Sequence, residues 1–317
     1  MMPSSKLNNK QKPKSSTNRL ARVFEFEAIG TVWHIHIEDR LSEASYSSLC
    51  RQIKDRIEIF DHNYSRFRSD SLVTFMSKNA GFYTLPEDAE LLLDLYEKLY
   101  KITNGQMTLL IGQMVSDAGY DPNYSLQPKP LRSTPKWEQA IDYKFPNLTV
   151  KTPVMLDFGA AGKGYLVDII ADLLKSQGLH SFSINAGGDI VNHNVSPSLA
   201  QVGLEHPTHS DEVIGVAKLT SGSICASAGN RRKWGAFHHI INPNTKQSPD
   251  HILSTWVVAD SALLADGIAT ALYFADARQL QKHFSFEYAL IRKDLQLESS
   301  SGFPGTFFVE QRKASEL

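Results

Sequence analysis

The sequence "LDFGAAGKGYLVD", residues 156–168, places three glycines and a lysine directly before a segment with helical periodicity. A phosphate loop of the Walker type needs four residues between its first glycine and a Gly-Lys-Ser/Thr end. Here only two residues separate the first glycine from Gly162, and Gly164 occupies the Ser/Thr position. The stretch is therefore not a nucleoside-triphosphate loop. It predicts a tight turn into a helix over residues 163–175, whose free N–H groups attract anions, or else a plain strand-to-helix turn.

Helical and strand patterns are interspersed along the rest of the chain. Residues 23–37 alternate apolar and polar side chains around Gly30, which predicts a strand pair or one kinked strand. Further helices are predicted from Ser42 to Phe60, from Pro86 to about Gly105, and from Asp260 or Ser261 to Phe274, the last of them in the chain. Further strands are predicted over 213–219, 221–229, 236–243, 252–259 and 305–310, together with a strand in 181–190 that ends in a double glycine and a strand hairpin over 286–298. Such interspersion without strict βαβ repetition favours an α+β fold, with a largely antiparallel sheet core and flanking helices.

The bulk composition excludes several classes of protein. The chain has 317 residues, 42% of them hydrophobic, and a formal net charge of −1, so no global charge favours nucleic acid or a membrane surface. No run of 18 apolar residues predicts a membrane span. The two cysteines lie far apart, which argues against a disulfide framework and fits a reducing compartment. Residues 1–22 are basic and predict a disordered tail, or a targeting or partner-binding arm, before one domain over residues 23–312.

A second glycine-rich stretch, "NAGGDI" at residues 185–190, ends a predicted strand. Gly187 and Gly188 would let the backbone approach a ligand closely, or would simply form a turn. Asp189 directly after them could bind a polar edge of that ligand.

A histidine pair lies in "FHHIINPNT", residues 237–245. His238 and His239 are neighbours on a predicted strand, so their side chains point to opposite faces and cannot both bind one metal ion without distortion. We expect one histidine to face a site as a base and the other to pack or to meet solvent.

The stretch "LLADGIATAL", residues 263–272, places Asp266 and Thr270 on one face of a predicted helix. An acid among apolar residues is unfavourable unless it is paired or bound to a metal. A carboxylate, a hydroxyl and a main-chain carbonyl are hard oxygen ligands, which suit Mg²⁺ better than zinc. The alternative is a solvated aspartate and a threonine bonded to its own helix.

Together, and in this order, the four stretches resemble the ApbE family, the FAD:protein FMN transferases. The family pattern runs D-[LF]-G-G-x-[AG]-K-G-Y-x-x-D, N-x-G-G-D-[IV], H-H-I-[IV]-[DN]-P-x-T-G and A-D-x-x-A-T. The segment from Tyr64 to Met76 is also similar to the family's S-x-[FW]-x-x-x-S pattern. The resemblance covers roughly residues 24–310.

The resemblance implies an α+β fold with a cleft for one FAD, and an enzyme that needs Mg²⁺. Such an enzyme transfers FMN from FAD to a Thr or Ser hydroxyl of a target protein and releases AMP. The resemblance assigns Mg²⁺ to Asp266, Thr270 and the main-chain carbonyl of Gly162. It makes His239 the residue that helps to deprotonate the acceptor hydroxyl, for which a histidine's usual pKa of about 6.5 is suitable. The implied pocket residues are Asp157, Lys163, Asp168, Gly187, Gly188, Asp189 and Ala228.

Several positions depart from the family pattern. They are Ile29 for a methionine, Thr108 for an acid, Ala228 and Asn230 for Ser and Asp, and Lys246 for a glycine. These changes leave two alternatives open, an FAD pyrophosphatase that uses water as acceptor, and an FAD-binding protein without transfer activity. Many family members are exported lipoproteins with an N-terminal cysteine. None is present here, so we expect a cytoplasmic protein or a trimmed exported form.

Overall fold

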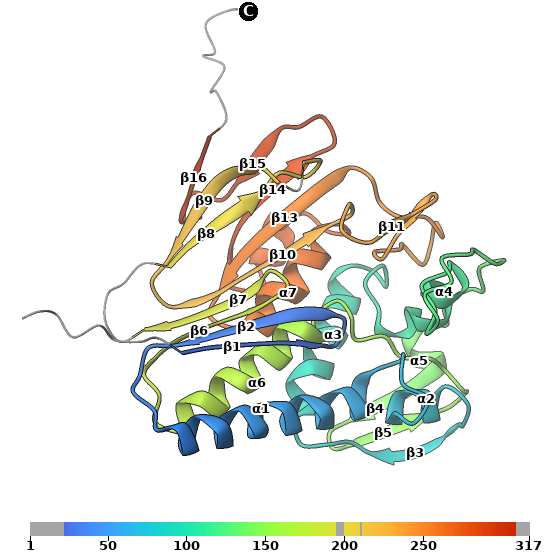
Figure 1. The fold of residues 1–317 in the computed structure, drawn as a ribbon. Coiled ribbons are helices and arrows are strands. Elements are labelled where there is room, and N and C mark those ends of the chain that lie inside the picture. The colour runs from blue at the N-terminus through green and yellow to red at the C-terminus, as the bar shows by residue number, and fades with distance from the viewer. Residues whose placement is uncertain (1–21, 195–199, 210, 309–317) are drawn as a thin grey trace, which may run out of the picture.

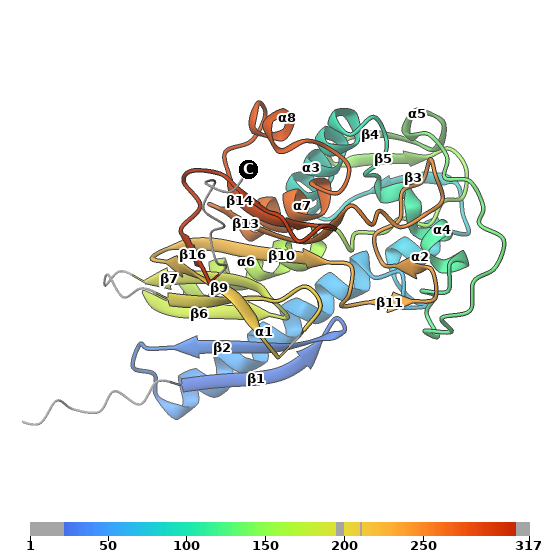
Figure 2. The ribbon, with the colours of Figure 1, turned by 90° about the horizontal axis from the view of Figure 1, so that it is seen from above.

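The computed structural model describes residues 22–194, 200–209 and 211–308, so residues 1–21 of the predicted N-terminal tail lie outside the described residues, whereas Arg22 begins a strand. Its centre is a sheet of eight strands in which every neighbouring pair is antiparallel. In spatial order the strands are β1 (Arg22–Ala28), β2 (Thr31–Ile37), β6 (Ser181–Ala186), β7 (Asp189–Asn194), β10 (Gly222–Ala228), β13 (Ile252–Ala259), β14 (Glu287–Arg292) and β15 (Leu297–Ser299). Figure 2 shows these strands side by side, with β1 at one edge.

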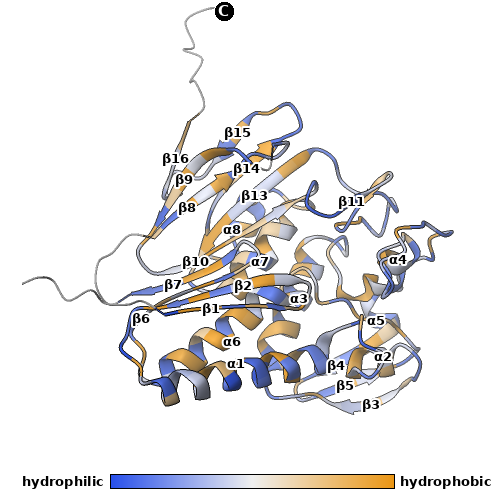
Figure 3. Cartoon of the chain, viewed as in Figure 1, coloured by the Kyte–Doolittle hydropathy of each residue, from blue (hydrophilic) through white to orange (hydrophobic). Residues whose placement is uncertain are grey.

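Helices cover one face of this sheet (Figure 1). The helices α6 (Gly162–Ser176) and α7 (Ala262–Ala271) pack on the strands, and α1 (Glu43–Tyr64) and α3 (Ala89–Ile102) pack on these two helices. Figure 3 shows polar residues over much of the outward side of α1, whereas α6 and the strands above it carry apolar residues. Burial of this apolar side is the main favourable contribution to the layer.

The opposite face of the sheet is covered by a second sheet, β16-β9-β8. Its strands are β8 (Ala200–Glu205), β9 (Val213–Leu219) and β16 (Gly305–Phe307). Alternate residues of the central strands therefore enter two cores. Cys225 and Val257 face the helices, whereas Ile224 and Trp256 face the second sheet.

Shorter elements gather beyond the ends of α1 and α3. They comprise α2 (Leu72–Met76), the sheet β3-β5-β4 (Gly81–Thr84, Asn147–Val150 and Ile141–Lys144), the 3₁₀ turn η1 (Leu109–Ile111), α4 (Gly112–Asp117), α5 (Trp137–Ala140), the ribbon of β11 (Lys233–Trp234) and β12 (Phe237–His238), and α8 (Ala277–Gln281). No helix in the described ranges has the length and apolar character that a membrane crossing requires.

Most of the predicted elements are present, with some changed boundaries. Ser42 caps α1 and accepts a hydrogen bond from Ser45 N, as predicted. Residues 23–37 form a hairpin rather than a kinked strand, since Ile29 and Gly30 both have positive φ, 45° and 74°, as a two-residue hairpin turn requires.

Three sequence predictions were wrong in extent. The helix predicted from Pro86 begins at Ala89, and the helix predicted to end at Phe274 ends at Ala271 and is followed by the short α8. The strand predicted over 236–243 is only the two-residue β12, because the chain bends after His238. The strand predicted to end in a double glycine is confirmed as β6, which ends at Ala186, and the next strand, β7, begins directly after the glycines at Asp189.

Candidate active site

The site is built on a close contact between α6 and α7. Gly164, on the first turn of α6, donates a hydrogen bond of 2.9 Å from its N–H to Oδ2 of Asp266 on α7. A β-carbon at position 164 would lie 2.2 Å from the carbonyl oxygen of Ala262 and 2.6 Å from Cβ of Asp266. The two helices can approach this closely only because residue 164 is glycine.

A buried ion pair lies beside this contact. Lys163 Nζ pairs with Oδ2 of the fully buried Asp189 and donates to the carbonyl of Ala186 at 3.2 Å. Burial lowers the pKa of Lys163, but the charges of Asp189 and Asp266 outweigh burial and leave this pKa above its usual value. Burial, followed by the charge of Asp189, raises the pKa of Asp266 well above its usual range.

The glycine pair in "NAGGDI" has a structural role in forming this cluster. Gly187 and Gly188 have φ of 59° and 100° and form the turn between β6 and β7. A β-carbon on Gly187 would lie 2.1 Å from Oγ1 of Thr31. The turn places Asp189 at the start of β7, where it meets Lys163.

Thr270 lies one turn after Asp266 on α7, and its hydroxyl has oxygen neighbours. It is 3.4 Å from the carbonyl oxygen of Ala160 and 3.3 Å from Oγ of Ser227. Gly162, whose carbonyl the resemblance assigned to a metal, is the first residue of α6, so its carbonyl points into the helix. The main-chain oxygen that the structure brings to Thr270 is therefore that of Ala160.

The turn before α6 is held by an arginine that the sequence analysis did not single out. Arg66 is 4% exposed and donates to Oδ2 of Asp157 at 2.5 Å and to the carbonyl of Tyr120 at 2.7 Å. The other carboxylate oxygen of Asp157 accepts from Gly159 N at 2.7 Å. The only sequence signal for Arg66 was its place in the segment similar to S-x-[FW]-x-x-x-S.

The two adjacent histidines have different surroundings. His238 is fixed by its neighbours, since Nδ1 accepts from Ile240 N at 3.3 Å and Nε2 lies 2.8 Å from the carbonyl of Pro249. His239 follows β12 in a bend, and its buried Nδ1 has no hydrogen-bond partner within the described ranges. Burial, and then the positive charges around it with Arg232 foremost, lower the pKa of His239 to about 3. Its imidazole is therefore neutral at neutral pH.

Two cavities meet at the turn of residues 157–162. The inner cavity, about 80 Å³, is lined among others by Tyr96, Thr108, Ala160, His239 and Thr270. The outer cavity, about 350 Å³, is lined among others by Phe67, Tyr124, Gly162, Lys163 and Arg66. Tyr120, Asp157, Gly159 and Arg232 line both.

The structure brings five of the sequence-predicted residues to the walls of the two cavities: Asp157, Gly162, Lys163, His239 and Thr270. Other predicted residues do not line these cavities. The group beneath the turn, around Lys163, contains Asp189, Asp266, Gly187 and Gly188. Ala228 ends β10 beside Ser227. Asp168 is on α6, and its carboxylate reaches the N-terminus of α7, where it accepts from Ala262 N at 2.9 Å and from Leu263 N at 2.8 Å.

For most of the residues that depart from the family pattern, the structure shows a cavity position or a hydrogen bond. Thr108 lines the inner cavity and caps η1 through its hydroxyl, and Ile29 lines the outer cavity. Lys246 has a φ of 57°, a conformation that favours glycine, and its ammonium donates to the carbonyl of Leu131 at 2.9 Å. Asn230 donates to the carbonyl of Pro207 at 2.6 Å.

The oxygen atoms around Thr270 are of the chemical type that Mg²⁺ prefers as ligands. Asp266, Thr270 and the carbonyl of Ala160 supply only hard oxygen atoms, and a carboxyl buried at 5% exposure gains from a cation. Within the described ranges no three His, Cys, Asp or Glu side chains form a group that could hold a metal ion. These three candidate ligands include a single carboxylate, that of Asp266. Magnesium sites with one or two carboxylates are commonly completed by the phosphates of a bound substrate.

A largely antiparallel sheet with helices on one face defines an α+β protein, and its candidate site is a cleft between the α6 turn and the bend that carries His239. The model of the ApbE family matches residues 29–289, and the chain belongs to this family. The predicted family and fold are confirmed.

Similar proteins include two named FAD:protein FMN transferases. That of Haemophilus influenzae is 24% identical over 311 residues, which cover 87% of this chain and 89% of the relative. That of Klebsiella pneumoniae is 22% identical over 284 residues, with coverage of 83% and 81%. Among solved structures, the flavin transferase ApbE from Vibrio cholerae has a TM-score of 0.75 at 20% identity and covers 89% of this chain and 98% of its own. The ApbE protein from Thermotoga maritima has a TM-score of 0.75 at 19% identity, with coverage of 89% and 97%.

Proposed function

We propose that this chain is an FAD:protein FMN transferase. It would use Mg²⁺ to move FMN from FAD to a Thr or Ser hydroxyl of a target protein, with release of AMP. The observation that carries the proposal is the convergence on one cleft of the residue 157–162 turn, the Asp266–Thr270 face of α7 and the neutral His239. Family membership and the printed names of the relatives support the same activity.

The outer cavity suits the flavin end of FAD. It has aromatic walls that include Phe67, Tyr120 and Tyr124, which can stack on a planar ring. Lys163 and Arg232 lie on the same walls, next to the N-terminus of α6, and they provide positive charge for a pyrophosphate at the junction of the two cavities.

Asp266, Thr270 and a main-chain carbonyl at the turn would hold Mg²⁺. When bound, the ion would neutralise the charge that develops on the pyrophosphate and its leaving phosphate. Position and charge neutralisation contribute most to phosphoryl transfer, so the rigid α6–α7 contact is itself part of the catalytic arrangement.

His239 would accept the proton of the attacking hydroxyl. It is neutral because it is buried near cations, so the lone pair on its unpartnered Nδ1 is available. A pKa of about 3 describes the protein without ligand, and an anionic pyrophosphate close by would raise it toward the range of an efficient base.

The test is to incubate the purified protein with FAD, Mg²⁺ and a pool of short synthetic peptides that each carry one central threonine. AMP and free FMN are measured by chromatography, and flavin on the peptides by mass spectrometry. AMP that appears together with flavinylated peptide, and that is lost with EDTA or in His239→Ala, supports the transferase. His283→Ala, a change at an exposed histidine after α8, is the matched control and should behave as wild type.

Two other outcomes would contradict the proposal. AMP with free FMN in the absence of any acceptor would indicate an FAD pyrophosphatase. Bound FAD without AMP under every condition would indicate a flavin-binding protein.

A further inference from the structure

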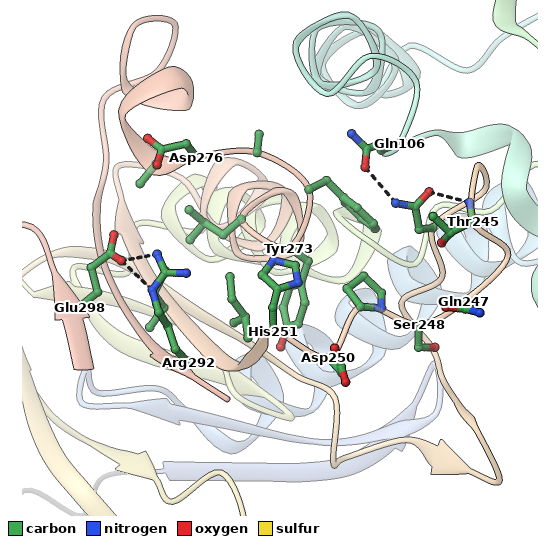
Figure 4. Close-up of a pocket in the computed structure, with 18 residues that line it drawn as sticks. Gln106, Thr245, Gln247, Ser248, Asp250, His251, Tyr273, Asp276, Arg292 and Glu298 are labelled. Carbon is green, nitrogen blue, oxygen red and sulfur yellow. Dashed lines mark hydrogen bonds and ion pairs between the residues drawn. The ribbon is translucent and has the colours of Figure 1, made fainter. Parts of the chain in front are cut away.

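We propose that a groove next to the inner cavity binds the segment of the target protein that carries the accepting hydroxyl, an inference that rests on the proposed function. This acceptor groove, about 490 Å³, runs between residues 245–252 on one side and residues 272–277 on the other. Figure 4 shows Gln106 and Thr245 toward one end of it and the Arg292–Glu298 ion pair toward the other. Its volume lies in the range of sites that hold small molecules or short segments.

The acceptor groove adjoins the inner cavity. Gln106 and Phe274 line both of them, and Phe274 lies one turn beyond Thr270. The side-chain oxygen of Gln106 accepts from Nδ2 of Asn242 at 2.8 Å, which fixes this shared wall. A hydroxyl carried into the Gln106 end of the groove would therefore lie next to the cavity that His239 and Thr270 line.

Hydrogen bonds also fix the wall of the acceptor groove to the bend that carries His239. Ser248 Oγ accepts from the N–H of His238 at 2.9 Å and donates to the carbonyl of His238 at 3.0 Å. The ring of His238 bonds to the carbonyl of Pro249 at 2.8 Å. A segment seated against residues 248–250 is therefore held at a fixed position relative to His239, the next residue along the chain.

The charged side chains that line the acceptor groove already have partners within the protein. Arg292 pairs with Glu298, Asp250 pairs with Lys293, and the carboxylate of Asp276 caps α8 by accepting from the main-chain N–H of Arg278. A nucleotide or another anion needs free cationic groups, and the one lysine or arginine of this lining, Arg292, is held by Glu298. The polar groups left without a hydrogen-bond partner among the described residues are uncharged: the hydroxyl of Thr245, the amide of Gln247 and the ring of His251. Burial, and then Arg292, lower the pKa of His251, so its ring is neutral at neutral pH.

Uncharged donors and acceptors along an open groove match the N–H and C=O groups of an extended polypeptide. In the transfer step the threonine or serine oxygen attacks the phosphorus atom of the FMN half of FAD. An O–P bond to the target protein forms, and the P–O bond to the AMP half breaks. The hydroxyl proton passes to His239, and AMP leaves with the electron pair of the broken bond.

The experiment obstructs the groove from both walls. Thr245→Trp and Ala275→Trp place a large ring in the groove at positions that are at least partly exposed, and Thr306→Trp on β16 is the matched control. The substrates are FAD, Mg²⁺ and the threonine peptide that wild type modifies fastest in the pool. We expect the KM for this peptide to rise about tenfold or more in both groove variants, with the affinity for FAD and the melting temperature unchanged. An unchanged peptide KM in both variants, or a loss confined to kcat, would overturn the proposal.

A second measurement does not depend on turnover. Gln247 is replaced by the photoreactive residue p-benzoylphenylalanine, and the protein is irradiated with the peptide pool in the absence of FAD. We expect cross-linked peptides, which Ala275→Trp in the same protein reduces. Cross-linking together with no transfer under any condition would contradict the proposed function and leave the groove supported. Transfer without cross-linking, and with an unchanged KM in the tryptophan variants, would overturn the groove alone.

Discussion

Replacing Gly164 by alanine tests whether the close contact between α6 and α7 determines the stability of the fold. The new methyl group would lie 2.2 Å from the carbonyl oxygen of Ala262, which is 1.2 Å closer than the 3.4 Å at which ordinary contact begins. Backbone cannot rotate away as a flexible side chain can, so α7 has to move. That movement would also lengthen the 2.9 Å hydrogen bond from Gly164 to Asp266.

The magnitude follows from these two effects. Overpacking of this kind destabilises a protein by about 1 to 3 kcal/mol. Loss of a buried hydrogen bond to the carboxyl group adds about 1 to 3 kcal/mol. We therefore expect Gly164→Ala to lower the free energy of unfolding by about 4 kcal/mol.

Gly178→Ala at the other end of α6 is the matched control. Gly178 has a φ of 76°, and no atom lies within 4 Å of the position that a β-carbon would take there, so only backbone strain of about 1 to 2 kcal/mol applies. Urea unfolding of both variants, followed by circular dichroism, measures the difference. If Gly164→Ala destabilises the protein no more than Gly178→Ala does, the reasoning about the helix contact is refuted.

Three further predictions concern titratable groups. His239→Ala should lower the transfer rate by about 10² to 10⁴ and leave the FAD dissociation constant unchanged, and a comparable loss of FAD affinity would contradict a role as a base. Lys163→Met should lower the free energy of unfolding by about 3 to 5 kcal/mol, because it leaves Asp189 buried without its partner, whereas Lys163→Met/Asp189→Leu should recover most of the loss in the same urea assay. Burial raises the pKa of Asp168 from 3.8 to about 6, so the folded chain binds this proton more tightly than the unfolded chain. The contribution of Asp168 to stability should therefore be largest below pH 4 and fall by up to about 3 kcal/mol as the pH rises to 6, and urea titrations of Asp168→Asn should lack this fall.

Local periodicity was sufficient for the elements that hold this site. Leu49, Ile53, Ile57 and Phe60 recur at helical spacing, and the structure buries all four on α1. Ser42 was recognisable as a cap because a serine before an apolar helical pattern can satisfy a free N–H group.

The contacts between distant elements could not be predicted in this way. β2 pairs with β6, and Gly164 bonds to Asp266, which is 102 residues away along the chain. Periodicity reports which face of an element is buried and does not report its neighbour. The ion pair of Lys163 with Asp189 and the support of Asp157 by Arg66 were missed for the same reason.

The spacing of Gly164 and Asp168 within residues 156–168 is explained by the contact between α6 and α7. Gly164 and Asp168 are four residues apart, so they share one face of α6. Gly164 bonds to Asp266, and Asp168 bonds to the N–H groups of Ala262 and Leu263, so the two helices are tied antiparallel at two points one turn apart. Asp168 thereby positions α7 by direct hydrogen bonds and lines neither the inner nor the outer cavity, although the resemblance assigned it to the pocket. The spacing of Gly164 and Asp168, in the stretch that was compared above with a phosphate loop, is thus the means by which α6 holds the carboxyl of Asp266 beneath the turn and the hydroxyl of Thr270 at the cavity wall.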